Sequence, residues 1–263
     1  MELGLRGKRA FISGSSQGIG YAVASALAAE GVDVVINGRD EGRVDAAVSV
    51  LARTHPEVTV SGIVADFADP SQVARLTERL GDVDILVNNV GLFGLADFVD
   101  VADEDWSRYF EVNVMSGVRL SRALLPGMRE RGWGRIVFVS SESGVNVPAD
   151  MVHYGVTKAA MIALGNGLAK LTRGTGVTVN TVLGGPTYSE GVAESVAAVA
   201  AAQSVSVDAM KQAIIGRNTT TLLERFLDPA EVADLVVYLS STRASATNGA
   251  ALRADGGVLT AML

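Results

Sequence analysis

The sequence contains no cysteine, and histidine occurs only twice, as His55 and His153. The absence of cysteine excludes disulfide bonds, thiolate catalysis and cysteine-ligated zinc. Two histidines are too few for a metal site built from imidazole groups, so we predict no metal. A chain without cysteine fits a reducing compartment, and we expect a cytoplasmic protein.

An excess of basic charge and a long apolar run are absent as well. The formal net charge is −7 and the pI is about 4.9, which gives no sign of the basic face that nucleic-acid binding requires. Residues 1–8 lack the apolar centre of a signal peptide. No uninterrupted apolar run reaches the roughly 18 residues of a membrane span. We therefore expect neither nucleic acid nor a membrane as a partner.

The composition and the order of patterns predict one α/β domain. Hydrophobic residues make up 48% of the 263 residues, enough for a large core. Short apolar runs alternate with longer helical patterns, which is the signature of βαβ units and a parallel sheet. No repeat or linker divides the chain, so residues 1–263 are predicted to form a single domain. The predicted strands are 9–13, 33–37, 59–64, 84–87, 135–140, 178–182 and 249–253.

Two helix starts and one long helical segment stand out. Residues 69–72 and 228–231 each place an acid at the N-cap, a proline in the first turn and Gln or Glu at the third position. Residues 186–227 show no clear strand and are predicted to form a lid or substrate loop. The apolar residues of this segment favour a hydrophobic ketone or alcohol: Val192, Val196, Val199 and Met210.

A glycine-rich loop follows the first predicted strand and precedes an alanine-rich helix. Its glycines have the spacing Gly-x-x-x-Gly-x-Gly. Glycines let the chain turn tightly and let a pyrophosphate approach the N-terminus of the helix, where amide groups favour anions. A glycine cluster alone is compatible with a simple turn, but the strand–loop–helix context favours a phosphate site. The candidate cofactor-binding residues are Gly14, Ser16, Gln17, Gly18, Ile19 and Gly20.

The end of the second predicted strand bears on the choice of dinucleotide. An acid at this position holds the ribose 2′-OH of NAD, whereas an arginine accommodates the 2′-phosphate of NADP. Gly38 stands where the acid is expected, and Arg39 follows it. This favours NADP(H), with NAD(H) also possible. In the alternative interpretation, Arg39 is a solvated charge and Asp40 is a helix N-cap, or Asp40 is itself the ribose acid.

Tyr154 and Lys158 form the most informative pair in the sequence. Residues four apart on a helix point the same way. An unperturbed tyrosine titrates at about 10, too high for a proton shuttle at neutral pH. A neighbouring ammonium favours phenolate, so Lys158 is expected to lower the pKa of Tyr154 and make it a usable acid or base. Ser141 precedes Tyr154 by thirteen residues.

Seven motifs in order make the chain resemble the short-chain dehydrogenase/reductase family over essentially its whole length. The resemblance implies a Rossmann-like, doubly wound parallel sheet of seven strands in the order 3-2-1-4-5-6-7, with helices on both faces. The motifs are the loop at 13–20, Asn88-Asn89-Val90-Gly91, Asn113 in a long helix, Ser141, Tyr154-x-x-x-Lys158, residues 180–189 and Asp255-Gly256-Gly257.

The resemblance also implies roles for individual residues. Tyr154 would be the general acid that protonates a carbonyl oxygen, or the base in the alcohol direction. Lys158 would lower its pKa and bind the nicotinamide ribose. Ser141 would orient the carbonyl, and Asn113 would hold a water that links Lys158 to solvent. The further cofactor contacts that the resemblance implies are Asp66 at the adenine, Asn89 at the cofactor floor, Thr187 and Ser189 at the carboxamide, and Gly91 and Gly185 nearby.

Four positions raise questions of their own. Gly184 stands where the family has proline. Glycine frees the backbone of the cofactor loop, whereas proline would fix its φ. Glu142 beside Ser141 is interpreted as a salt-bridge partner at a helix edge or a subunit interface, with pairing to a polar substrate as the alternative. His153 is interpreted as packing or pocket wall, and Asn88 as a residue that ties neighbouring strands. The apolar tail at 257–263 would suit burial against a neighbouring subunit or against its own.

The leading hypothesis is an NADP(H)-dependent carbonyl reductase or secondary-alcohol dehydrogenase that acts on a small-molecule ketone or alcohol. One alternative is reduction of 3-oxoacyl chains on an acidic acyl carrier protein, with a basic docking face at Arg129, Arg131 and Arg135. Another is a non-catalytic NADP-binding regulatory protein, although such proteins usually lose the tyrosine or the lysine. The resemblance further implies a homo-oligomer, a tetramer formed through helices near 106–128 and 152–173.

Overall fold

The computed structural model describes residues 2–218 and 220–262. Seven parallel strands form one sheet in the order β3-β2-β1-β4-β5-β6-β7, which is the predicted Rossmann-like topology. Each predicted strand is present, and the bounds differ by a few residues at most ends. The strands are β1 Arg9–Ile12, β2 Asp33–Gly38, β3 Val60–Val64, β4 Ile85–Asn88, β5 Trp133–Ser141, β6 Gly176–Gly184 and β7 Ala251–Ala254.

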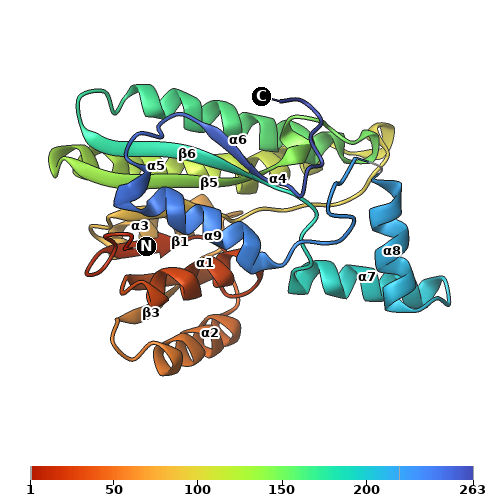
Figure 1. Cartoon of the computed structure of the whole chain (residues 1–263), viewed down its shortest axis with the longest axis horizontal. Helices are drawn as coiled ribbons and strands as arrows, with labels where there is room; N and C mark the ends of the chain where they lie inside the picture. Colours follow the sequence, from red (N-terminus) through yellow and green to blue (C-terminus); the bar gives the residue numbers. More distant parts are fainter. Residues whose placement is uncertain (1, 219, 263) are drawn as a thin grey trace.

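Helices cover both faces of the sheet and enclose two apolar cores. One core lies under α1 (Gly18–Ala29), α2 (Glu41–Thr54) and α9 (Pro229–Ser240), and α9 packs beside α1 (Figure 1). The other lies under α3 (Pro70–Leu80), α5 (Ser116–Glu130) and α6 (Val152–Lys170). Successive side chains of a strand point to opposite faces. The central strands are therefore apolar at nearly every position, as parallel strands covered on both faces must be.

Both predicted helix starts are confirmed. The Asp228 side chain accepts from the Ala230 amide, and the Glu231 side chain reaches back to the Asp228 amide, which completes a capping box at α9. Asp69 caps α3 in the same way. There, however, Gln72 accepts from the amide of Asp66 instead of closing the box, because the chain before α3 turns back over the helix start.

The long helix expected near 106–128 is interrupted. A helix α4 (Asp103–Phe110) passes into a π-helical turn at Glu111–Met115, and α5 begins at Ser116. Such single π turns are common at functional sites. The turn carries Asn113, whose side chain bonds to the backbone of Leu92 in the loop after β4. The sequence pattern does not reveal this interruption because it depends on a contact with a distant loop.

The segment 186–227 contains two helices, α7 (Glu190–Ala202) and α8 (Val207–Arg217), which project from the body of the molecule (Figure 1). They share a small apolar core of their own, centred on Val196, Ala200 and Met210. At its base the segment is closed by a bridge between Thr187 and Leu227. Its role as a lid or substrate loop stays a prediction.

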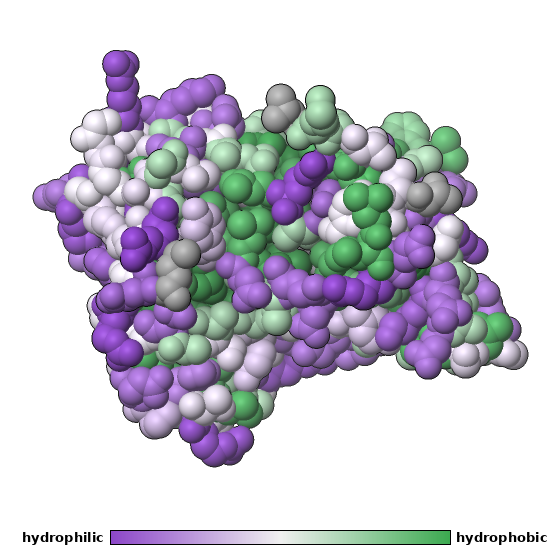
Figure 2. Space-filling view, viewed as in Figure 1, coloured by the Kyte–Doolittle hydropathy of each residue, from purple (hydrophilic) through white to green (hydrophobic). Residues whose placement is uncertain are grey.

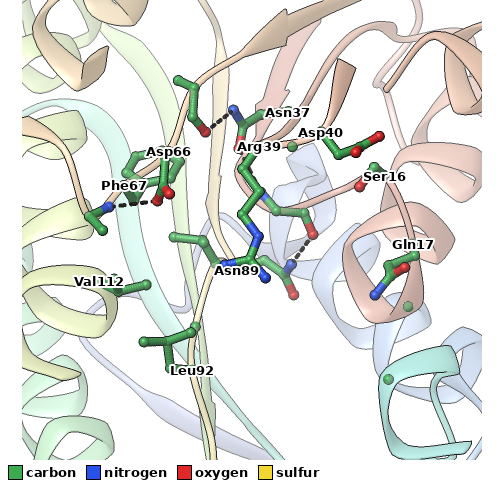
Figure 3. Close-up of a pocket in the computed structure, with 18 of the residues that line it drawn as sticks. Ser16, Gln17, Asn37, Arg39, Asp40, Asp66, Phe67, Asn89, Leu92 and Val112 are labelled. Carbon is green, nitrogen blue, oxygen red and sulfur yellow. Dashed lines mark hydrogen bonds between the residues drawn. The ribbon is translucent and has the colours of Figure 1, made fainter. Parts of the chain in front are cut away.

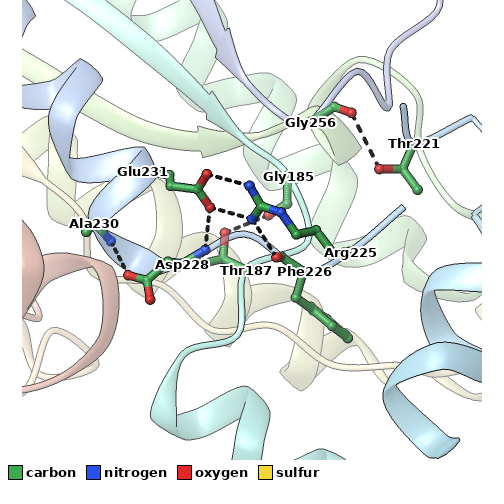
Figure 4. A network of polar contacts seen from close by, with 9 residues as sticks. All are labelled: Gly185, Thr187, Thr221, Arg225, Phe226, Asp228, Ala230, Glu231 and Gly256. Carbon is green, nitrogen blue, oxygen red and sulfur yellow. Dashed lines mark hydrogen bonds and ion pairs between the residues drawn. The ribbon is translucent and has the colours of Figure 1, made fainter. Parts of the chain in front are cut away.

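A polar network borders the same base (Figure 4). Arg225 donates from both terminal nitrogens to the carboxylate of Glu231, at 2.7 and 2.8 Å. Thr187 donates to the carbonyl of Gly185 at 2.9 Å. The ion pair is exposed to solvent, so its contribution to stability is small. It orients the chain where the projecting segment rejoins the start of α9.

Apolar atoms gather on the face where the C-terminal segment and the loop before α9 meet (Figure 2). Leu222 is 82% exposed and Met262 94% exposed, whereas Val258 is buried. A Cβ at Gly257 would lie 2.6 Å from Cγ of Leu222, so the loop and the tail are in contact. The described part of the tail thus packs in part on its own chain. Across the described residues, no helix is both long and apolar enough to cross a membrane.

Candidate active site

The candidate site lies at the carboxyl end of the sheet, where the strand order reverses between β1 and β4. Connections from the two neighbouring strands turn away to opposite faces at this point. Ligands of open α/β sheets bind in the crevice that this arrangement leaves. The loops after β1, β2, β3 and β4 line a cleft of about 490 Å³ here.

The glycine loop after β1 has the backbone shape that only glycine adopts without strain. Gly14 and Gly18 have φ of 62° and 64°. A Cβ at Gly20 would lie 2.4 Å from the carbonyl oxygen of Gly14 and 2.5 Å from Nδ2 of Asn89. That amide nitrogen donates to the Ser13 and Gly14 carbonyls at 3.0 and 2.8 Å. Asn89 therefore holds the loop in place as well as lining the cleft.

The N-terminus of α1 is open toward the cleft. Gln17, the N-cap residue, makes no side-chain capping bond. The amide of Gly18 instead donates to Oε2 of Glu190, at the start of α7, at 2.7 Å. A carboxylate at a helix N-terminus shows that this position favours an anion. The loop thus fits the pyrophosphate of a dinucleotide, because its glycines leave room and its helix supplies amide donors.

The far end of the cleft is formed by the loops after β2 and β3 (Figure 3). Asp40 accepts a hydrogen bond from the Arg43 amide at 2.8 Å and so caps α2. This is the N-cap role given above as one alternative for Asp40. The Arg39 side chain points into the cleft. A Cβ at Gly38 would lie 2.8 Å from Oγ of Ser16, so a side chain there would displace Ser16, and the acid typical of NAD sites is missing. Asp66 lines the opposite wall.

Ser141, Tyr154 and Lys158 meet in a smaller pocket of about 160 Å³ beside the glycine loop. Ser141 is the last residue of β5, and the other two lie one turn apart on α6. Lys158 is buried, and its Nζ donates to the carbonyl of Val139 at 3.0 Å. The same Nζ lies 5.6 Å from the centre of the Tyr154 ring. The fold thus brings together the three residues that the sequence singled out.

Burial dominates the pKa values of Tyr154 and Lys158. Lys158 is expected to lower the pKa of Tyr154, but that pKa is raised. Burial raises the pKa of Tyr154, the hydrogen bond with Ser141 opposes that rise, and the nearby charge of Glu142 adds to it. Burial lowers the pKa of Lys158 to about 8. Burial is the largest cause of the shift in the pKa of Tyr154, and Lys158 is not among the causes. Tyr154 is therefore held in its protonated form in the chain described, as a weaker acid than a free phenol.

Asn113 is fully buried and has every polar atom of its side chain engaged. Its Oδ1 accepts from the Leu92 amide at 2.6 Å, and its Nδ2 donates to the Leu92 carbonyl and to Oγ1 of Thr157. A Cβ at Gly91 would lie 3.4 Å from Asn113 Oδ1 and 3.5 Å from Lys158 Nζ, which places both groups beside the glycine. Asn113 thereby positions the loop after β4. Its role in holding a water stays a prediction.

Glu142 follows Ser141 directly and faces the same groups. It accepts hydrogen bonds from the hydroxyls of Ser141 and Ser143. Burial raises its pKa, and these hydrogen bonds oppose that rise. Within residues 2–218 and 220–262 Glu142 forms no ion pair, so the expected salt bridge at a helix edge is not formed, and a salt bridge across a subunit interface stays a prediction. The local turn directs its carboxylate toward the serines instead.

His153 and Asn88 are both buried beneath the site. His153 is 3% exposed and packs edge-on against Tyr109, with ring centres 4.4 Å apart, as expected of a packing residue. The interpretation of Asn88 as a tie between strands is not supported, since its side-chain amide has no hydrogen-bond partner among the described residues. Its two neighbouring strands are joined by backbone bonds alone.

The loop after β6 closes the nicotinamide end of the predicted site. Gly185 packs flat on Asp255, because a Cβ there would lie 2.5 Å from the Asp255 carbonyl oxygen. Thr187 is buried, and Ser189 lines the larger cleft. At Gly184 the nearest atom to a Cβ would be 3.8 Å away, so a side chain has room. Packing does not require glycine at this departure from the family pattern.

Two residues of the site escaped the sequence reasoning. Asn37 accepts from the Gly14 amide at 3.1 Å and donates to the Ile63 carbonyl at 2.9 Å, which joins the loops after β1 and β3. Its signal was a polar residue at the end of an apolar run. Glu190 reaches the glycine loop from 172 positions away, and no local pattern indicates such a contact. Within the part of the chain described, no cluster of three metal-ligating side chains occurs.

The fold and the site define an α/β protein with a buried tyrosine and lysine beside a glycine loop that fits the pyrophosphate of a dinucleotide. The model of the short chain dehydrogenase family matches residues 8–200. The chain therefore belongs to the short-chain dehydrogenase family and is an oxidoreductase of that family.

Individual relatives cover almost the whole chain. An uncharacterized oxidoreductase of Bacillus subtilis, YvaG, is 41% identical over 98% of both chains. The 3-oxoacyl-[acyl-carrier-protein] reductase FabG of Vibrio cholerae is 31% identical over 97% of this chain and 99% of its own. Among solved structures, L-sorbose reductase from Gluconobacter frateurii, complexed with NADPH and L-sorbose, is 33% identical over 100% of both chains, with a TM-score of 0.95.

Proposed function

We propose that this protein is an NADP(H)-dependent reductase of ketones, or a dehydrogenase of secondary alcohols in the reverse direction. The observation that carries the proposal is the meeting of Ser141, Tyr154 and Lys158 in one pocket that opens beside the glycine loop. Burial keeps the Tyr154 phenol protonated, and carbonyl reduction requires one proton at oxygen.

Each residue has a distinct part in this proposal. Tyr154 Oη gives its proton to the carbonyl oxygen, and the Ser141 hydroxyl orients that oxygen. Lys158 supplies positive charge beneath them, which stabilises negative charge that develops on the oxygen. When bound, NADPH would supply the hydride that the carbonyl carbon receives. The bonds that break are the Tyr154 O–H and the donor C–H, and the new C–H and O–H bonds form the alcohol.

The preference for NADP(H) rests on Arg39 and on the absence of an acid at Gly38. An arginine in that place accommodates the 2′-phosphate. The L-sorbose reductase of similar structure is itself complexed with NADPH. The contacts of Gly14, Gly18, Asp66, Thr187 and Ser189 with the dinucleotide are part of the same proposal.

Reduction of 3-oxoacyl groups on an acyl carrier protein is the second candidate, and the similarity to FabG favours it. The arginines expected to form its docking face argue against it. Arg135 is 2% exposed and donates to three backbone carbonyls. Arg131 is paired with Asp82 at 2.7 Å. Of the three, Arg129 alone is left for docking, and an acidic carrier protein requires a broader basic face.

We also propose a cytoplasmic homo-oligomer, a tetramer. A groove between α5 and α6 supports this, since its lining is largely apolar and includes Leu125, Leu164, Leu168 and Leu171. Light scattering after gel filtration tests it, and a monomer at micromolar concentration would contradict it.

The activity is tested by following oxidation of NADPH and of NADH with a panel of aryl ketones, β-keto esters, hydroxyketones and acyl thioesters. We expect turnover of at least one ketone with NADPH. Tyr154→Phe should lower kcat by at least about 1,000-fold and leave the Kd of NADPH within about twofold, because general acid catalysis contributes roughly 10²–10⁴-fold. Persisting turnover in this variant, or a wild type that binds NADPH but reduces nothing, would overturn the proposal.

A further inference from the structure

Glu142 is a carboxylate without a structural task that accounts for it. The turn in which it lies is already closed by other bonds: Ser143 donates its amide to Oγ of Ser141 at 3.1 Å, and the amides of Val145 and Asn146 donate to the Glu142 carbonyl at 2.9 Å. The side chain contacts the hydroxyls of Ser141 and Ser143, both of them buried. Removing a carboxylate from water costs free energy unless partners compensate for it.

The position of this carboxylate couples it to the reacting groups. The charge of Glu142 adds to the rise in the pKa of Tyr154. It opposes the fall in the pKa of Lys158 that burial causes. The carboxylate also accepts a hydrogen bond from the Ser141 hydroxyl. A hydroxyl has only one proton to donate. As long as Ser141 donates to Glu142, it cannot donate to the oxygen of a substrate carbonyl.

A substrate hydroxyl next to the carbonyl resolves this conflict. An ionised carboxylate is an acceptor only, so a substrate hydroxyl can take the place of the Ser141 hydroxyl as its donor. A hydroxyl on the carbon beside the carbonyl would reach Glu142 while the carbonyl oxygen stays near Ser141 and Tyr154. Its proton replaces that of Ser141, and the Ser141 hydroxyl becomes free to donate to the carbonyl oxygen. A ketone with a methyl group in that place leaves Ser141 engaged with Glu142 and offers the carboxylate no further donor.

We propose that Glu142 recognises a hydroxyl group adjacent to the reacting carbonyl, so that the substrates are α-hydroxyketones and, in the oxidative direction, 1,2-diols. This inference rests on the ketone reductase function proposed above and names its substrate class. It makes Glu142 a specificity-determining residue that also controls the donor state of Ser141.

Three ketones of nearly equal size test the proposal: 1-hydroxypropan-2-one, butan-2-one and 1-aminopropan-2-one. We expect the wild type to prefer the hydroxyketone to butan-2-one by about 10- to 100-fold in kcat/KM, since a hydrogen bond to a charged group discriminates by that order. In Glu142→Ala the ratio should fall to within about threefold of one. Glu142→Gln keeps an acceptor oxygen and should give an intermediate ratio.

A matched control is Glu78→Gln on the exposed face of α3, which removes the same charge far from the pocket and should keep the wild-type ratio. NADPH binding by fluorescence shows that each variant is folded. A ratio that Glu142→Ala leaves unchanged, a wild type without preference for the hydroxyl, or a preference for the aminoketone would overturn the inference. Each of these leaves the reductase function standing, whereas a wild type that reduces no ketone in either panel overturns both.

Discussion

Replacing Arg39 with alanine should weaken binding of NADPH far more than binding of NADH. The Arg39 side chain points into the cleft, and its guanidinium is the group expected to meet the 2′-phosphate (Figure 3). Gly38 leaves no acid to repel that phosphate. Asp40 is engaged in capping α2, and Arg43 donates to Oε1 of Gln17 at 3.0 Å.

The size of the effect follows from the exposure of Arg39. A hydrogen bond to a charged group contributes about 1.5–3 kcal/mol when sheltered from water. Arg39 is exposed, so solvent and salt screen the interaction, and we expect a smaller contribution than this, about 1–2 kcal/mol. This corresponds to roughly a 5- to 30-fold increase in the Kd of NADPH. NADH lacks the 2′-phosphate, and its Kd should change by less than about twofold.

Fluorescence titration with each cofactor, at low and at high salt, measures both constants. The NADPH deficit of Arg39→Ala should shrink at high salt, because screening weakens the wild-type contact. Arg53→Ala, which removes an equal charge in the last turn of α2, should change neither Kd appreciably. Equal losses for the two cofactors would refute the 2′-phosphate assignment. A selective loss of NADH binding in Asp40→Asn would point to Asp40 as the ribose acid instead.

Three further perturbations follow from the geometry. Burial lowers the pKa of Lys158 to about 8, so its cationic fraction falls above that pH, and kcat/KM for reduction should decline there; a flat profile to pH 9.5 would contradict the role of the ammonium. Gly20→Ala forces a Cβ against the Gly14 carbonyl, which should lower the free energy of unfolding in urea by about 1–3 kcal/mol and weaken the binding of NADPH. Gly167→Ala has open space around it and should raise the free energy of unfolding by up to about 1 kcal/mol. Similar changes for the two variants would refute the packing argument. Arg135→Met leaves three backbone carbonyls without their donor and should lower the unfolding free energy by about 2–4 kcal/mol; an unchanged urea midpoint would show that these bonds contribute little.

Much of the fold could be read from local patterns, and the reason is that those patterns are local in origin. The apolar runs at 33–37 and 135–140 became β2 and β5, because strands buried on both faces need side chains that lose little on leaving water. Asp69 and Asp228 each satisfy amides within three residues, so their caps form wherever the helix does. The strand order came from resemblance to a family, and the sheet confirmed it.

Where the sequence failed, the deciding contact lay far along the chain. The π-helical turn at Asn113 accompanies a bond to Leu92, 21 positions away. Whether Asn88 finds a partner depends on what packs around β4, and nothing near it in the sequence indicates that. The sequence predicts a salt bridge for Glu142 at a helix edge or an interface. In the structure the turn after β5 directs the Glu142 carboxylate to the hydroxyls of Ser141 and Ser143.

Several chemical features of this protein can be read directly from its residues. It lacks thiols, and it has a glycine loop ahead of a helix and a tyrosine and lysine on one helix face. Those properties are set by residue type and short-range spacing. The burial of each group and the charges around it come from the tertiary structure. Burial at the edge of the sheet makes Tyr154 a weaker acid and Lys158 a weaker base, and it places the Glu142 carboxylate against Ser141. Desolvation depends on everything that surrounds a group, and the surroundings here come from segments that are distant in the sequence.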